Sequence, residues 1–299
     1  MRIFRRLGCF TPYFILRPLR HTRSRTEMTD LAALALQGKV VVVTGAARGI
    51  GEALAKAFGE AKCNVVIADR MKRPDGRQRT EALAKEIKNA GGDAVVVQTD
   101  VSKHTDVERM FQTAVERFGR VDVFVNNAAI MKGGSLLDMN EQNLNEHFEV
   151  NVKGCFDCCQ SAAKQMIKQG GGGKIIIISS VDGLGAEEGI VAYSTSKAAL
   201  ILMMKCMAVE LAPRGINVNA IAPGWVETDM TIPYLNESLM KELKKRIPAG
   251  YMAKPEHMAG GALFLASHLS DYVNGHVLVI DGGLTSNITI KADQGGVQY

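Results

Sequence analysis

Short runs of apolar, mostly β-branched residues alternate with longer helical patterns from residue 39 onward. Each run is continuously apolar and does not alternate with polar residues, which indicates strands covered on both faces. Strands of this kind, separated by helices, are typical of a parallel, doubly wound α/β sheet. The pattern predicts seven strands, at residues 40–43, 64–68, 94–98, 121–126, 174–179, 217–222 and 277–281. The predicted helices between them include residues 50–61, 106–118, 145–168 and 196–211.

A chain of 299 residues, 46% of them hydrophobic, can form one large α/β domain or two small ones. The polar loop 73–77 and the glycine-rich connection 170–173 are too short to separate domains. We therefore predict a single α/β domain over residues 37–284 that contains every candidate site. The other segments are a basic leader at 1–27, a linker at 28–36 and a C-terminal tail at 285–299.

The net charge of +5 is carried by the leader. Residues 1–27 contain seven Arg residues and one acid, and the rest of the chain contains 29 basic and 30 acidic residues. A domain with balanced charge gives no reason to expect nucleic-acid binding. No apolar run reaches the roughly 18 residues that a membrane helix needs, so we expect no stable membrane insertion.

The leader has the composition of a mitochondrial transit peptide, with Arg and hydroxyl residues and no acid before Glu27. The alternative is that translation starts at Met28, directly before the domain. The first interpretation predicts a protein of the mitochondrial matrix and the second a cytoplasmic one.

The six cysteines show neither disulfide-framework nor metal-site spacing. Cys155 and Cys158 form a Cys-x-x-Cys pair, but no second pair of ligands lies nearby at zinc spacing. Because the pair falls inside a helical pattern, we expect buried thiols and no metal. Unpaired thiols indicate a reducing compartment.

The helical segment 196–211 is apolar around most of its circumference, so we expect it to be buried on several sides. A helix on the outside of a sheet meets that requirement by packing against a second subunit. This predicts a homo-oligomer, either a homodimer or a homotetramer. A broad intramolecular core face is the alternative.

A glycine-rich turn, Gly45-Ala46-Ala47-Arg48-Gly49-Ile50-Gly51, links the first predicted strand to the next helix. Its glycines allow a tight turn and a close approach of a pyrophosphate to backbone N–H groups. The helix that begins there directs its positive end at the phosphates. This context favours a dinucleotide site over a purely structural turn.

Asp69 ends the second predicted strand, 18 residues after Gly51. A carboxylate near this spacing binds the ribose hydroxyls of adenosine and would repel a 2′-phosphate, which favours NAD. Arg48 and Arg70 argue the other way, because either guanidinium could pair with that phosphate. The sequence therefore predicts NAD as the cofactor and leaves NADP as the alternative.

Tyr193 and Lys197 are four residues apart at the start of a helical pattern and so share one helix face. A free phenol has a pKa of about 10, too high for a good base at neutral pH. A nearby ammonium group and a positive nicotinamide ring would both stabilise the phenolate. Tyr193 is therefore a candidate to accept the proton of an alcohol while hydride leaves its carbon.

These motifs resemble those of the classical short-chain dehydrogenase/reductase family over about residues 37–284. The likeness includes Thr44-Gly45-x-x-x-Gly49-Ile50-Gly51, Asp100-Val101, Asn126-Asn127-Ala128-Ala129, Asn151, Ser180, Tyr193-x-x-x-Lys197, Pro223-Gly224 and Asp281-Gly282-Gly283. The resemblance implies a Rossmann-type fold and an NAD(P)-dependent oxidoreductase that interconverts a secondary alcohol and a ketone. The C-terminal half is most similar to 3-oxoacyl-(acyl-carrier-protein) reductases and glucose 1-dehydrogenases.

The resemblance also implies four catalytic residues. Ser180 would orient and polarise the substrate oxygen, and its spacing of thirteen residues to Tyr193 favours it over Ser179. Tyr193 would be the acid/base, and Lys197 would lower the pKa of Tyr193 and bind the nicotinamide ribose. Asn151 would hold a water molecule in a proton relay from Lys197 to solvent.

Cofactor contacts are implied for further residues of the matched motifs. They are Gly45, Arg48, Gly49, Ile50, Gly51, Asp69, Arg70, Asp100, Val101, Asn127, Ala128, Tyr193, Lys197, Pro223, Gly224, Val226 and Thr228. One departure from the family pattern is Ala129, where glycine is usual and the added methyl group would crowd the cofactor slightly.

Fold and mechanism do not determine the substrate. In the family, the substrate pocket is formed by the segments that match 181–192 and 229–254, and the second is a candidate mobile lid with an apolar lining. Two alternatives to an NAD-linked alcohol dehydrogenase are a 3-oxoacyl-thioester reductase that uses NADPH and a non-catalytic nucleotide-sensing protein. Proteins of the latter kind typically lack the Tyr or the Lys, and both are present here.

Overall fold

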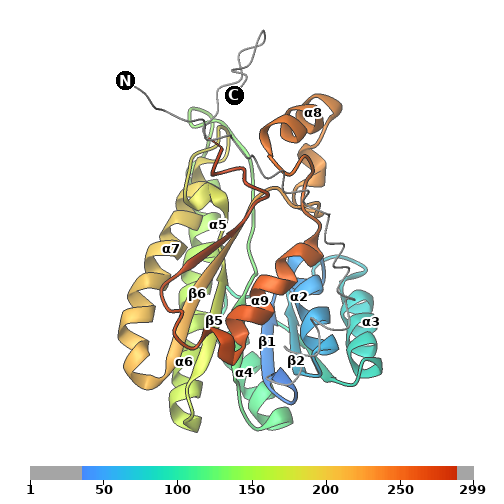
Figure 1. Cartoon of the computed structure of the whole chain (residues 1–299), viewed down its shortest axis with the longest axis vertical. Coiled ribbons are helices and arrows are strands. Elements are labelled where there is room, and N and C mark those ends of the chain that lie inside the picture. Colours follow the sequence, from blue (N-terminus) through green and yellow to red (C-terminus); the bar gives the residue numbers. More distant parts are fainter. Residues whose placement is uncertain (1–35, 288–299) are drawn as a thin grey trace, which may run out of the picture.

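The computed structural model describes residues 36–287, and seven parallel strands form one sheet in the order β3-β2-β1-β4-β5-β6-β7. The strands are β1 Val40–Thr44, β2 Asn64–Asp69, β3 Asp93–Gln98, β4 Val123–Asn126, β5 Gly173–Ile178, β6 Ile216–Pro223 and β7 Val277–Ile280. Helices cover both faces of this sheet (Figure 1). The predicted fold class, a single doubly wound Rossmann-type domain with a seven-stranded parallel sheet, is confirmed.

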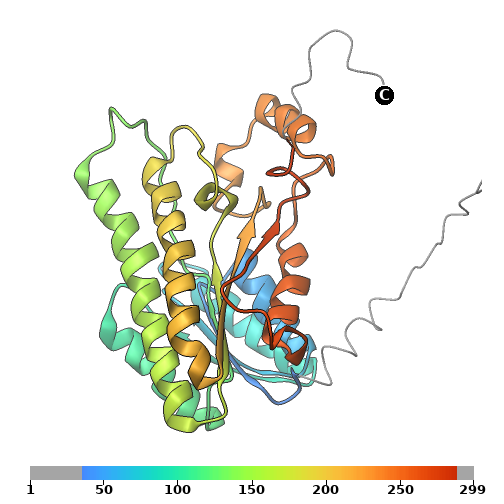
Figure 2. The same ribbon diagram turned by 60° about the vertical axis from the view of Figure 1, so that its left-hand side comes forward.

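Helices α2, α3 and α9 cover one face of the sheet, and α4, α6 and α7 cover the other (Figure 1 and Figure 2). The short helix α5 precedes α6, and α8 lies beyond the carboxyl ends of the strands (Figure 1). The helices are α2 Gly49–Glu60, α3 Gly76–Asn89, α4 His104–Phe118, α5 Glu141–His147, α6 Gly154–Gln169, α7 Val191–Leu211, α8 Glu237–Arg246 and α9 Ala259–Ala266.

Neighbouring residues of one strand belong to different hydrophobic cores. Val41 and Val43 of β1 pack on the side of α2, whereas Val42 packs on the side of α4 and α6. Successive side chains of a strand point to opposite faces, so a strand covered on both faces must be apolar at every position. This geometry explains the continuous apolar runs of the sequence.

Two helices differ from those predicted. The segment 145–168, predicted as one helix, is interrupted by a π-helical turn at Phe148–Lys153 between α5 and α6. Such a turn adds one residue to a helical turn, a local change that the spacing of apolar residues does not report. Helix α7 begins at Val191 and not at residue 196, because the polar residues of its first turn obscure the apolar pattern.

Cys155 and Cys158 are buried in α6, as expected, and burial raises the pKa of the Cys158 thiol well above its usual value. Within residues 36–287, no cluster of His, Cys, Asp and Glu side chains could hold a metal ion. None of the helices that the structure describes is both long and apolar enough to cross a membrane. The predicted leader, nearly all of the linker and most of the C-terminal tail lie outside the described residues.

Candidate active site

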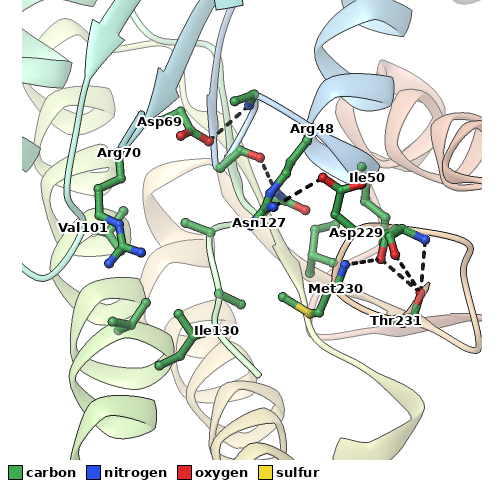
Figure 3. A pocket seen from close by; sticks show the side chains of 18 of the residues that line it. Arg48, Ile50, Asp69, Arg70, Val101, Asn127, Ile130, Asp229, Met230 and Thr231 are labelled. Carbon is green, nitrogen blue, oxygen red and sulfur yellow. Dashed lines mark hydrogen bonds and ion pairs between the residues drawn. The ribbon is translucent and has the colours of Figure 1, made fainter. Parts of the chain in front are cut away.

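A pocket opens at the carboxyl end of the sheet, where the chain crosses from β3 to the other side of β1 (Figure 3). Doubly wound sheets bind their ligands at such a switch point. All the predicted site residues except Gly51 and Asn151 line this pocket. Those two contact Gly45 and Ile130, which do line it.

The glycine-rich turn leaves no room for a side chain at two of its positions. Gly45 has a φ of +64°, and a Cβ atom there would lie 2.9 Å from the Cα of Ala128. A Cβ atom on Gly51 would lie 2.2 Å from the carbonyl oxygen of Gly45. The Asn127 side chain holds the turn by donating to the carbonyl oxygens of Thr44 (2.9 Å) and Gly45 (3.1 Å). The turn therefore presents bare backbone to the pocket.

The N-terminus of α2 opens onto the same pocket. Arg48 precedes the helix in an extended conformation, and its side chain does not cap the first backbone N–H groups. Uncapped N–H groups and the positive end of the helix dipole together form an anion site. The turn and the helix therefore fit the pyrophosphate of a dinucleotide.

Asp69 lies at the end of β2, beside the turn. Its two carboxylate oxygens accept hydrogen bonds from the backbone N–H groups of Ala47 (3.1 Å) and Met71 (2.8 Å). These bonds hold the carboxylate at the pocket wall (Figure 3). A carboxylate fixed at this point suits the ribose hydroxyls of adenosine.

The two arginines that favour NADP have different surroundings. Arg48 Nη1 lies 3.4 Å from a carboxylate oxygen of Asp229, and the same oxygen lies 2.8 Å from Arg73 Nη1. Arg70 lies on the Val101 side of the pocket (Figure 3). Asp229 therefore partly neutralises two guanidinium groups near the place where a 2′-phosphate would bind.

The wall formed by the end of β6 and the segment after it includes Pro223, Gly224, Val226 and Thr228, and Thr228 lies next to Gly49 of the glycine-rich turn. Within the segment after β6, the Thr231 hydroxyl donates a hydrogen bond to the Val226 carbonyl oxygen at 2.5 Å. Asp100, Val101, Asn127 and Ala128 complete the predicted cofactor wall.

Tyr193 and Lys197 lie in the first two turns of α7, and both are buried. Lys197 Nζ is 5.5 Å from the centre of the Tyr193 ring and donates to the Ile178 carbonyl oxygen at 2.8 Å. Ser180, two residues after β5, lies within hydrogen-bonding reach of Tyr193. The Ser179 hydroxyl instead donates to the backbone oxygen of Lys197 at 2.9 Å. The geometry thus favours Ser180 over Ser179 as the partner of Tyr193.

Desolvation is the largest influence on the pKa values of Tyr193 and Lys197. Burial raises the pKa of Tyr193 well above its usual value, the charge of Asp182 raises it further, and the hydrogen bond with Ser180 lowers it. Burial lowers the pKa of Lys197 to about 8. Lys197 is not among the groups that shift the pKa of Tyr193, so the lowering expected from Lys197 stays a prediction. A positive nicotinamide ring would act in the lowering direction.

Asn151 lies in the π-helical turn and is fully buried. Its Oδ1 accepts from the Ile130 N–H at 2.8 Å, and its Nδ2 donates to the Ile130 oxygen and to Ser196 Oγ, both at 3.0 Å. The side chain thus connects the segment after β4 with α7. Both polar atoms of the Asn151 side chain are already hydrogen-bonded to protein groups, so a water molecule of the proton relay would have to bind the backbone of this residue.

Known proteins match nearly the whole described domain. A family model described as enoyl-(acyl carrier protein) reductase matches residues 45–285. A 3-oxoacyl-(acyl-carrier-protein) reductase of Thermotoga maritima is 40% identical over 249 residues, which cover 83% of this chain and 98% of that protein. The chain belongs to the classical short-chain dehydrogenase/reductase family. It is accordingly an NAD(P)-dependent oxidoreductase with a small-molecule substrate.

Solved structures of other short-chain dehydrogenases/reductases agree with this assignment. One from Mycobacterium marinum is 37% identical, with a TM-score of 0.80, and the match covers 86% of this chain and 99% of that chain. A gluconate 5-dehydrogenase from Burkholderia cenocepacia, in complex with NADP and tartrate, is 35% identical, with a TM-score of 0.80. That match covers 87% of this chain and the whole of the other.

In this short-chain dehydrogenase/reductase, the sequence reasoning missed two side chains next to Tyr193. His147 is fully buried, and its ring meets the Tyr193 ring edge-on at 6.5 Å between centroids. Its Nε2 accepts from the Lys132 N–H at 3.2 Å, and its Nδ1 lies 2.8 Å from the Asn143 oxygen. The other missed residue is Asp182, whose only sequence signal is its place two residues after Ser180.

Proposed function

We propose that this protein interconverts a secondary alcohol and a ketone, with NAD(H) as its preferred cofactor and Asn151, Ser180, Tyr193 and Lys197 as its catalytic apparatus. The observation that supports this most is that Ser180, Tyr193 and the buried Lys197 line the pocket that also contains Asp69. Residues from β2, β5 and α7 thus face one cavity.

The hydroxyl groups of Ser180 and Tyr193 bind the substrate oxygen from two sides. Tyr193 gives its proton to this oxygen during ketone reduction and takes it back during alcohol oxidation. NAD(H), when bound, exchanges a hydride with the substrate carbon. Lys197 stabilises the phenolate of Tyr193, and Asn151 supports α7 through its hydrogen bond to Ser196.

A panel of secondary alcohols and ketones, assayed by NADH and NADPH absorbance, tests this function. Turnover of at least one alcohol–ketone pair is the expected result. Nucleotide binding without turnover of any member would support the nucleotide-sensing alternative.

A second candidate is the reduction of a 3-oxoacyl thioester with NADPH. The 40% identity with the Thermotoga maritima reductase favours it. A 3-oxoacyl thioester in the same panel distinguishes the two. A preference for that thioester together with NADPH would support the second candidate.

The preference for NAD is a prediction that rests on Asp69, since its carboxylate would repel a 2′-phosphate. We expect kcat/KM with NAD to exceed that with NADP by at least about tenfold, and Asp69→Asn to narrow the ratio. Steady-state rates with each cofactor measure this. A wild-type preference for NADP would contradict the assignment.

The segment 229–254 has a small core of its own. Leu243, Ile247 and Met252 are buried together, and Leu239 and Met240 pack against them. Met230 is the residue of this segment's expected apolar lining that faces the pocket (Figure 3). We propose that Met230 contacts an apolar part of the substrate or the nicotinamide.

We further propose that the protein is a homo-oligomer that packs through α6 and α7. Leu202 and Val209 lie seven residues apart on α7 and are 65% and 77% exposed, and Phe156 on α6 is 49% exposed. Exposed apolar side chains on adjacent helices are typical of a subunit interface. This supports a homodimer through these helices, and a homotetramer if a second face also pairs.

Leu202→Glu is expected to raise the dissociation constant of the oligomer by at least about tenfold, because a buried, unpaired carboxylate would face the partner. Light scattering after size-exclusion chromatography measures the mass. Leu137→Glu is the control, since Leu137 is 94% exposed and lies outside both helices. An unchanged mass for the Leu202 variant would rule out this interface.

The composition of residues 1–27 supports import into the mitochondrial matrix, and initiation at Met28 in the cytoplasm is the alternative. Mass spectrometry of the native N-terminus distinguishes them.

A further inference from the structure

The carboxylate of Asp182 is hydrogen-bonded to the hydroxyl of Ser180. Ser180 Oγ donates to Asp182 Oδ2 at 2.9 Å, and the Asp182 N–H donates back to Ser180 Oγ at 3.1 Å. The two residues lie at the start of the short 3-10 turn Val181–Gly183, which packs closely on the backbone of α7. A Cβ atom on Gly183 would lie 2.8 Å from the Lys197 carbonyl carbon, so this turn cannot shift easily.

Glu187 is the partner of Asp182. The two carboxyl groups are within hydrogen-bonding reach of each other, and a hydrogen bond forms between them only when one of them holds a proton. Burial, followed by the charge of Asp182, raises the pKa of Glu187 to about 7. Burial also raises the pKa of Asp182. The charged groups that face this pair are Lys197 from α7 and Arg246 from α8, and the phenol of Tyr193 is close to both acids.

A serine hydroxyl has one proton to donate. When that proton is directed to Asp182, Ser180 offers only a lone pair to the substrate oxygen. A ketone oxygen that gains negative charge in the transition state needs a donor at this position. When the acid pair holds a proton, Asp182 attracts the Ser180 proton less strongly, and the hydroxyl is free to donate to the substrate.

We propose that Asp182, together with Glu187, is a positioning residue that controls whether Ser180 donates its proton to the substrate oxygen. The pair acts through Ser180 and does not itself touch the reacting atoms. Loss of the shared proton weakens the stabilisation of the transition state, which is common to both directions of the reaction. This inference rests on the proposed role of Ser180.

The first test is a carboxyl titration that needs no substrate. In protein labelled with 13C at the side-chain carboxyl carbons of Asp and Glu, we expect one Glu signal with a midpoint near 7. This signal should be missing in Glu187→Gln and should move to lower pH in Asp182→Asn, because the neighbouring charge is removed, while burial keeps its midpoint above the ordinary Glu value of about 4.3. A Glu187 signal that titrates in the ordinary range in the wild type would overturn the proposal.

The second test is the pH profile of kcat/KM for ketone reduction. We expect the wild type to lose activity as pH rises through about 7, by roughly tenfold in total. Glu187→Gln and Asp182→Asn should lack this step and keep only the later one from Lys197, whose pKa is about 8. Glu188→Gln is the matched control, because Glu188 is exposed like Glu187 but affects the pKa of neither Asp182 nor Glu187, and it should retain both steps.

A step near 7 that persists unchanged in both Glu187→Gln and Asp182→Asn would show that the pair does not control Ser180. If the wild type reduces no ketone, the proposed function fails instead, and the carboxyl titration still reports on the pair.

Discussion

Replacing Tyr193 with phenylalanine is expected to lower kcat by about 10³- to 10⁴-fold, the contribution typical of a positioned acid/base. The phenol hydroxyl is the one group at this position that can exchange a proton with the substrate oxygen, while the ring continues to pack against His147. The Kd for NAD should stay within about threefold of the wild-type value, since the substitution removes one oxygen atom from a large binding surface. NADH absorbance measures turnover, and fluorescence titration measures binding.

Tyr272→Phe is the matched control for this variant. Tyr272 is fully exposed and lies outside the pocket. The same chemical change at Tyr272 should leave kcat within about twofold of the wild-type value, because surface substitutions away from the site have small effects. Retention of more than about a tenth of the activity in Tyr193→Phe would show that another group acts as the acid/base.

Replacing Gly51 with alanine is expected to abolish measurable NAD binding and to lower the stability of the domain by about 2–3 kcal/mol, as overpacking does. The added Cβ atom would lie 2.2 Å from the Gly45 carbonyl oxygen and 2.5 Å from Asn127 Nδ2. The closer atom belongs to the backbone, so no side-chain rotation relieves the clash. The glycine-rich turn must move away from β4, and its N–H groups then lose their alignment.

Gly260→Ala provides the comparison, because nothing lies within 4 Å of a Cβ atom at that position in α9. Alanine favours a helix over glycine, so this variant should be as stable as the wild type or more stable by up to about 1 kcal/mol. Thermal melts and NAD titrations of both variants measure the difference. A Gly51 variant that binds NAD normally would show that the turn adapts and is not a rigid cradle.

Much of the site could be predicted because it depends on short stretches of sequence. The glycine-rich turn must follow a strand and begin a helix, and that context is visible in residues 40–61. Tyr193 and Lys197 share a helix face because they are four residues apart, whatever the surrounding fold. The position of Asp69 could also be predicted from local sequence, because it directly follows the apolar run of the second predicted strand.

Other features depend on contacts between distant segments, and no local pattern reports them. His147, the last residue of α5, meets Tyr193 in the first turn of α7, 46 residues further along the chain. Arg48 is paired with Asp229, which is 181 residues away. The raised pKa of Tyr193 reflects burial among residues from several elements, whereas the expectation of a lowered value was drawn from Lys197 and a bound nicotinamide ring.

The sequence by itself determined the doubly wound sheet, the dinucleotide turn and the identity of the candidate acid/base, because strand and helix periodicities and short motifs are properties of neighbouring residues. Only the tertiary structure decided the pKa values and hydrogen-bond partners of these groups. It placed Asp182 against the hydroxyl of Ser180 with Glu187 beside Asp182, and it removed Tyr193 and Lys197 from water. Proton affinity depends on desolvation and on charges brought close by folding, and neither quantity is present in the order of the residues.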